Sequence, residues 1–233
     1  MPPINLNKGF KKDWEKIDEL TKQGLLVDRE LNFFLEPVFP NTVERVTFIR
    51  RCLKKLKTRR MLLRAQWYTH IADDQEKVRN NRPALKIIFL IALAEAVTKM
   101  RISTNNIGSL EAIKNFFKYI LPTDKRILMN DFQRALTKPK HHTLRFSSII
   151  SILYDVRNKA VHGEDYYSFS LLDNKRKNEF KTGEYTDWGL MTFGDLGKQN
   201  RKRRVTLDTR ITYDELRDIF RRTAIENIKS LFR

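Results

Sequence analysis

Residues 87–97 read Ile-Ile-Phe-Leu-Ile-Ala-Leu-Ala-Glu-Ala-Val, which is the most apolar run of the chain. Pro83 precedes this run, and proline is favoured in the first turn of a helix. A membrane span needs about 20 apolar residues, and this run is shorter and contains Glu95. The run therefore predicts a helix that is buried on most of its circumference. One apolar face of that helix is formed by Leu85, Ile88, Phe89, Ala92 and Ala96.

The rest of the composition also favours helices, because the 233 residues include only eight glycines and seven prolines. Before the apolar run, Asn41 resembles a helix cap. From Asn41 onward, apolar residues follow one another at alternating steps of three and four. This spacing predicts one long amphipathic helix that reaches about Val78 and packs its apolar seam on another helix. The seam consists of Val46, Ile49, Leu53, Leu56, Leu63 and Trp67.

Beyond the apolar run, the sequence predicts helices over about 110–120, from Thr123 to about 138, and over about 144–161. The last of these helices has one apolar face, formed by Ile149, Leu153, Val156 and Ala160. Thr212 and Glu215 form a capping box that opens a terminal helix. The apolar face of that helix consists of Leu216, Ile219, Phe220, Ala224, Ile228 and Leu231. Short aromatic or β-branched segments at 166–172, 185–193 and 204–211 predict two or three strands. We therefore expect a mostly α-helical bundle, with an N-terminal helical extension over residues 1–80. The domain over 81–233 would carry a small β insertion at about 166–211.

The chain is strongly basic, with 46 Lys and Arg against 28 Asp and Glu and a formal net charge of +18. Such a surplus favours polyanionic partners. Two clusters are candidate RNA-binding surfaces. The first covers residues 50–64 and includes Lys54 and Lys57, and the second covers residues 201–204. The alternative for 50–64 is a solvated helix face. No feature supports a membrane partner. The second group consists of Arg201, Lys202, Arg203 and Arg204.

Cys52 is the only cysteine, so no disulfide can form within the chain. We read it as a packed thiol in a reducing compartment. The first residues lack the basic and apolar pattern of a signal peptide. Together these features predict a cytoplasmic protein.

The segment with the clearest chemistry is Arg157-Asn158-Lys159-Ala160-Val161-His162, which ends the predicted helix over 144–161. A guanidinium binds phosphate well, and an imidazole can move a proton near neutral pH. On a helix, Asp155, Asn158 and His162 share one stripe, but Arg157 points about 140° away from His162. Two copies of the helix across a twofold axis could aim both groups at one phosphate. The spacing therefore predicts a dimer.

This motif, together with the apolar helix that contains residues 92–96, resembles the HEPN superfamily and is most similar to its ApeA-like branch. Many members of the superfamily are metal-independent endoribonucleases with a composite site between two protomers. The resemblance implies that Arg157 and His162 are catalytic and that Asn158 occupies the polar position of the motif. The branch silenced by nucleotidyl transfer has a tyrosine two residues after the histidine, where this chain has Glu164. Control by that modification is therefore not expected.

The resulting hypothesis is a HEPN-like homodimeric endoribonuclease that cleaves single-stranded RNA without a metal or other cofactor. Asp155 would support His162 by fixing its tautomer. By resemblance, the protein would act as a toxin or antiviral effector, with an antitoxin or regulatory protein as a further partner. Two alternatives stay open. One is a HEPN-like module that binds RNA or a protein without cleavage, and the other is a basic nucleic-acid-binding protein with a chance motif.

Overall fold

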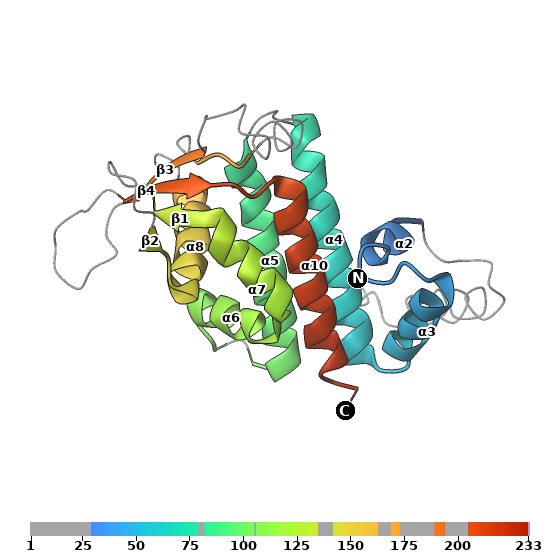
Figure 1. Ribbon diagram of the computed structural model, residues 1–233. Coiled ribbons are helices and arrows are strands. Elements are labelled where there is room, and N and C mark those ends of the chain that lie inside the picture. Colours follow the sequence, from blue (N-terminus) through green and yellow to red (C-terminus); the bar gives the residue numbers. More distant parts are fainter. Residues whose placement is uncertain are drawn as a thin grey trace, which may run out of the picture.

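The computed structural model describes residues 29–78, 82–104, 106–134, 142–162, 169–172, 189–193 and 205–232. These residues form a mostly α-helical bundle with a small sheet at one end (Figure 1). A 3₁₀ turn over Phe117–Tyr119 directly follows the helix that ends at Phe116. The helices are α2 (Arg29–Leu35), α3 (Thr42–Leu53), α4 (Leu56–Val78), α5 (Pro83–Ile102), α6 (Ser109–Phe116), α7 (Pro122–Asp131), α8 (Phe146–His162) and α10 (Tyr213–Lys229).

The apolar run lies in α5, which is the central helix and contacts α4, α6, α8 and α10. Because neighbours pack against it from several sides, α5 is buried on most of its circumference, as predicted. The most buried face differs from the predicted one. The predicted face, which includes Ile88 and Ala92, is only partly buried. The fully buried side chains are Ile87, Leu90, Ile91, Leu93, Ala94, Val97 and Thr98.

The prediction of one long amphipathic helix before α5 is wrong. The chain turns at Lys54 and Lys55, which separate α3 from α4. The buried Thr58 hydroxyl donates to the carbonyl oxygens of Cys52 (2.7 Å) and Lys55 (3.0 Å), so the turn keeps its backbone acceptors paired. Beyond the turn, the buried face of α4 carries none of the predicted seam residues. It consists of Thr58, Met61, Leu62, Ala65, Thr69 and Ala72.

Cys52 itself is fully buried at the end of α3. Burial raises the pKa of its thiol to about 12, although the charge of Arg51 opposes the shift. A thiol in this state is protonated at neutral pH and is a poor nucleophile, which agrees with the reading of a packed thiol.

The sheet is antiparallel, with the order β2-β1-β4-β3. Its outer strand β3 (Gly189–Phe193) and the neighbouring β4 (Val205–Thr209) fall within the region where strands were predicted. The other two strands precede α8. β1 (Phe132–Arg134) falls where the sequence predicted a helix continuing to about residue 138, and β2 (His142–Thr143) lies between two predicted helices, where no strand was predicted. The sheet is therefore not an insertion confined to residues 166–211. It is assembled from segments on both sides of the motif helix.

The terminal helix α10 begins with the predicted capping box. Thr212 accepts from the backbone N–H of Glu215, and the Glu215 carboxylate accepts from the backbone N–H of Thr212. Its predicted apolar face is buried from Leu216 to Ile228 against α4 and α5. One hydrophobic core joins α2, α3 and α4 to the later helices, so the core crosses residue 80. The division into an extension and a domain stays a prediction.

Across the part of the chain described above, no helix combines the length and the apolar character that a bilayer crossing requires.

Candidate functional site

The motif lies at the C-terminal end of α8, which contacts α5, α6 and α7. The buried face of α8 includes Ile149, Leu153 and Val156, all three of which were predicted for that face. Val156 is 2% exposed and directly precedes Arg157. The first residue of the motif is therefore anchored to the core, whereas the helix end at Val161 and His162 is exposed.

Arg157 is half-buried, and its Nη1 donates to the side-chain oxygen of Asn158 at 2.9 Å. This bond orients the guanidinium along the helix surface and leaves its other four N–H groups for further acceptors. The side-chain oxygen of Asn158 is thus engaged with Arg157. A role for Asn158 in orienting the imidazole or a phosphate stays a prediction.

The relation between Arg157 and His162 follows from the regular helix that contains both. Five residues correspond to about 140° of rotation and to roughly 7.5 Å along the helix axis. The two side chains therefore leave α8 on different sides. A phosphate contacted by both groups would need one of them from another copy of the chain, which is the basis of the predicted dimer.

Asp155 is half-buried beside the motif. Burial raises the pKa of its carboxyl, and the nearby charge of Lys159 partly opposes this shift. Seven residues separate Asp155 from His162, which is roughly 10.5 Å along the helix axis. The two side chains cannot form a hydrogen bond across that separation within one chain. The predicted support of the His162 tautomer by Asp155 would therefore need two copies of the chain, and it stays a prediction.

The raised pKa of Asp155 predicts a pH-dependent stability effect. Folding disfavours the ionised form of Asp155. Its carboxyl therefore lowers the free energy of unfolding only at pH values above the ordinary pKa range of a carboxyl group, where it is ionised in the unfolded chain. We expect Asp155→Asn to be more stable than the wild type at pH 7 and equally stable near about pH 3. Urea unfolding at the two pH values measures this difference. A less stable variant at pH 7 would mean that the ionised carboxylate makes a favourable contact.

Three cations of the basic cluster over 50–64 bond to other parts of the fold, and two of them hold residues 231 and 232. Arg51 donates to the carbonyl oxygen of Phe232 at 3.0 Å, and its guanidinium lies 4.4 Å from the centre of that ring. Lys55 donates to the carbonyl oxygen of Leu231 at 3.4 Å. Lys57, one of the predicted RNA-binding residues, donates to the hydroxyl of Ser103 at 2.9 Å. These three cations are at least partly structural.

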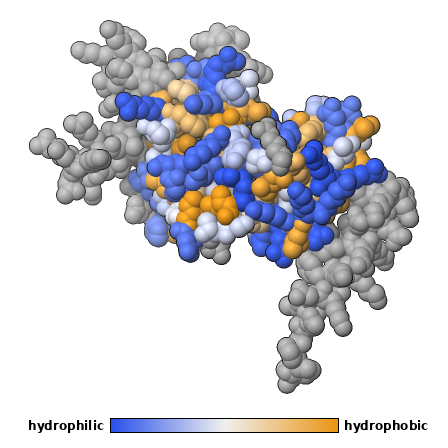
Figure 2. Space-filling view, turned by 90° about the horizontal axis from the view of Figure 1, so that it is seen from below, coloured by the Kyte–Doolittle hydropathy of each residue, from blue (hydrophilic) through white to orange (hydrophobic). Residues whose placement is uncertain are grey.

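Four other cations of this cluster have no counterion among the residues that the structure describes. Arg50, Lys54, Arg60 and Arg64 are exposed, and none pairs with a carboxylate among the described residues. Seen from the end where α10 finishes, hydrophilic side chains cover most of the surface, with apolar groups between them (Figure 2). The other predicted cluster, Arg201 to Arg204, lies outside the described residues.

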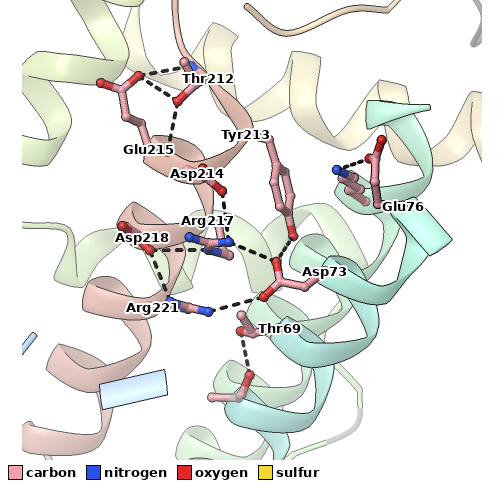
Figure 3. A network of polar contacts seen from close by, with 12 residues as sticks. Thr69, Asp73, Glu76, Thr212, Tyr213, Asp214, Glu215, Arg217, Asp218 and Arg221 are labelled. Atoms are coloured by element: carbon pink, nitrogen blue, oxygen red, sulfur yellow. Dashed lines mark hydrogen bonds and ion pairs between the residues drawn. The ribbon is translucent and has the colours of Figure 1, made fainter. Parts of the chain in front are cut away.

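A polar network that the sequence did not predict joins α4 to α10 (Figure 3). Asp73 on α4 is its centre. Its carboxylate accepts from the Tyr213 hydroxyl at 2.7 Å and from Arg217 at 3.2 Å, and it pairs with Arg221 at 3.4 Å. Asp218 lies 3.4 Å from both arginines, and Asp214 lies 2.9 Å from Arg217.

Burial controls the protonation of this network. Arg221 is 2% exposed, and burial followed by the charge of Arg217 lowers its pKa. Burial and the charge of Asp73 raise the pKa of the Tyr213 hydroxyl, which therefore stays protonated and donates. Every charged group of the network is also engaged in an ion pair. The network is thus suited to holding α4 against α10 rather than to acid–base catalysis.

A cavity of about 770 Å³ opens beside the network. Its walls include Phe33, His70, Arg82, Lys86 and Leu172. Five cationic and four acidic side chains line it, so the cavity is nearly neutral in a chain that carries a large positive charge. The described residues hold no group of three or more histidine, cysteine or acidic side chains placed to bind a metal ion. Nothing in these walls favours a polyanion.

The sequence could not reveal this cavity, because Asp73 and Tyr213 are 140 residues apart. The only local signal was the spacing of Arg217 and Arg221, which are one helical turn apart on the terminal helix. Such a pair is usual on a solvated helix face.

The chain matches no protein-family model, no curated protein and no solved structure. The class of this protein is therefore defined by its geometry alone. It is a basic, mostly helical protein with an arginine and a histidine at the exposed end of a well-anchored helix.

Proposed function

We propose that the protein is a HEPN-type endoribonuclease that cleaves single-stranded RNA in the cytoplasm without a metal cofactor. The observation that carries the proposal is the position of the motif. Arg157 follows a residue anchored in the core, and His162 ends the same helix in contact with solvent. A phosphate-binding group and a proton-transfer group thus lie on one rigid, accessible element. A role as a toxin or antiviral effector is part of the same proposal.

In the proposed reaction, the RNA supplies the nucleophile. The 2′-oxygen attacks the adjacent phosphorus as it loses its proton, and the bond from phosphorus to the 5′-oxygen breaks. The 5′-oxygen takes up a proton, and a 2′,3′-cyclic phosphate is formed. His162 transfers one of these protons, since an imidazole titrates near neutral pH. Arg157 stabilises the negative charge that gathers on the phosphorane oxygens.

The proposed site draws its groups from two protomers, because Arg157 and His162 of one helix point in different directions. An isologous dimer would place α8 of one protomer beside α8 of its partner. Each phosphate would then lie between Arg157 of one protomer and His162 of the other. Val161, which is exposed at the end of α8, is available for this interface.

The chemistry predicts that cleavage persists in EDTA and leaves 2′,3′-cyclic phosphate or 3′-phosphate ends. An RNA with a 2′-O-methyl group at the scissile position should resist cleavage, because its nucleophile is blocked. Product ends can be identified by mass spectrometry. A strict requirement for magnesium, or products with 5′-phosphate ends, would contradict this mechanism.

The second candidate function is a module that binds RNA without cleaving it. The exposed cations Arg50, Lys54, Arg60 and Arg64 favour this function, since they can bind phosphates whether or not α8 is catalytic. Binding without product under the same conditions would support this alternative.

A further inference from the structure

We infer that Trp67 is a stacking position for a base of single-stranded RNA, with Arg60 and Arg64 contacting the phosphates beside that base. This inference names a binding surface for the proposed substrate, and it rests on the proposed function for the choice of RNA as the polyanion. The surface lies on α4 and is distinct from the motif on α8.

The first observation is the exposure of Trp67. The sequence pattern placed this residue in a buried seam, yet its side chain is 47% exposed. The described residues of α4 that are buried lie on the opposite side of the helix. Tryptophan is highly buried on average, and an exposed one has an apolar surface that the fold does not use. Such a position needs another explanation.

The second observation is the charge around the ring. Arg60, Arg64 and Trp67 follow at steps of four and three, and they therefore fall within about 60° of the helix circumference. The Arg64 guanidinium lies 5.4 Å from the centre of the Trp67 ring, which is within the range of a cation–π contact. The ring of Tyr68 lies 5.0 Å from Trp67 and limits its movement. An aromatic face is thus held beside two exposed cations.

The third observation is that no carboxylate in the described part of the chain neutralises these charges. Arg51, Lys55 and Lys57 are bound to the end of the chain or to Ser103, whereas Arg60 and Arg64 have no carboxylate partner among the described residues. Like charges four residues apart slightly destabilise a helix. An RNA strand would offset this repulsion.

The basic part of α4 also has a defined end. His70 pairs with Asp74 at 3.3 Å, and the last two turns carry Asp73, Asp74 and Glu76. These carboxylates would repel phosphates. A strand following α4 would therefore run along its first half and finish near Trp67. Stacked aromatic side chains beside cations are the usual means of binding single strands without reading their sequence.

The inference can be tested by the fluorescence of Trp67 in the full chain. Trp14→Phe and Trp188→Phe leave Trp67 as the only tryptophan, and His162→Ala prevents cleavage during the titration. The probes are oligo(U), oligo(A) and heparin, which is a polyanion without bases. We expect saturable quenching by both oligonucleotides. Heparin should compete for the cations but should not quench the ring by stacking.

The roles of the ring and the cations can be separated by the anisotropy of labelled oligo(U), which measures binding. These measurements use the His162→Ala chain that retains all three tryptophans. Trp67→Ala should weaken binding roughly 5- to 150-fold, the effect of losing one stacked base, with the salt dependence unchanged. Trp67→Phe should recover part of the affinity. Arg60→Gln with Arg64→Gln should instead flatten the salt dependence, by about 0.7 for each lost phosphate contact. Val78→Ala, which removes another exposed apolar side chain from α4 beyond its acidic turns, should have no effect.

Failure of this inference can be distinguished from failure of the proposed function. If RNA is cleaved but Trp67→Ala binds RNA normally and the fluorescence of Trp67 does not change on binding, the inference is overturned and the proposed nuclease function is retained. If Trp67 responds as expected but the wild type does not cleave RNA, the inference stands and the nuclease fails. Equal quenching by heparin would mark the surface as a general polyanion site and overturn stacking. A response only to anionic vesicles of phosphatidylserine and phosphatidylcholine would assign it to membranes instead.

Discussion

His162→Ala and Arg157→Ala should each lower the rate of RNA cleavage by about 100-fold or more. Loss of the imidazole removes the group that moves a proton, and loss of the guanidinium removes the positive charge that stabilises the phosphorane. Rates are measured with labelled RNA at saturating and at limiting substrate. The effect on the rate at saturation should be large, because both groups act in the transition state.

Matched controls separate catalysis from folding. His70→Ala removes another exposed histidine, and Arg126→Ala removes an exposed arginine on α7; both should cleave normally. Because His162 is exposed, His162→Ala should unfold at the same urea concentration as the wild type. Near-normal cleavage by this variant would assign the motif to structure and favour a binding module.

Mixing the two inactive variants should restore part of the activity. In a dimer of Arg157→Ala and His162→Ala protomers, one of the two composite sites would contain both an intact Arg157 and an intact His162. Up to half of the mixed dimers' sites would then be active. If the two groups worked within one chain, mixing would restore nothing. Full activity from a monomer would exclude the composite site.

The elements predicted well from the sequence are those determined by local pattern. For α8 and α10, the apolar spacing of 3.6 residues predicted the helix and the buried face, and the Thr212–Glu215 capping box fixed the start of α10. The central position of α5 also followed from its composition. These signals lie within about 20 residues of the chain, so they need no knowledge of the rest of the fold.

The failures arise where distant segments decide the outcome. Trp67 fitted an apolar pattern continued from α3, but the turn at Lys54 and Lys55 starts a new helix with a new phase. Strands β1 and β2 have only three and two residues, which is too short for an alternating pattern to be visible. The partners of Asp73 lie on α10, 140 or more residues later in the chain. No local pattern contains such a pairing.

Asp73→Ala should lower the free energy of unfolding by about 2 to 3 kcal/mol, because it leaves a buried arginine charge without its main counterion. The affected cation is Arg221, which is 2% exposed and would keep only Asp218 at 3.4 Å. The Tyr213 hydroxyl would lose its acceptor as well. Urea unfolding of the full chain measures the change. The neighbouring Asp74→Ala is the control, since Asp74 pairs with Lys77 and His70 at the surface, where ion pairs contribute little.

Arg221→Met tests whether the loss arises from the buried charge. In the wild type, this substitution removes a charged group that the interior disfavours, together with its ion pairs, so its effect should be small. Combined with Asp73→Ala, it should recover a large part of the lost stability, because no unpaired cation then stays in the core. The two substitutions would thus be strongly non-additive. If Asp73→Ala were no more destabilising than Asp74→Ala, the network would not be what holds α4 against α10, and the apolar contacts between these helices would be sufficient.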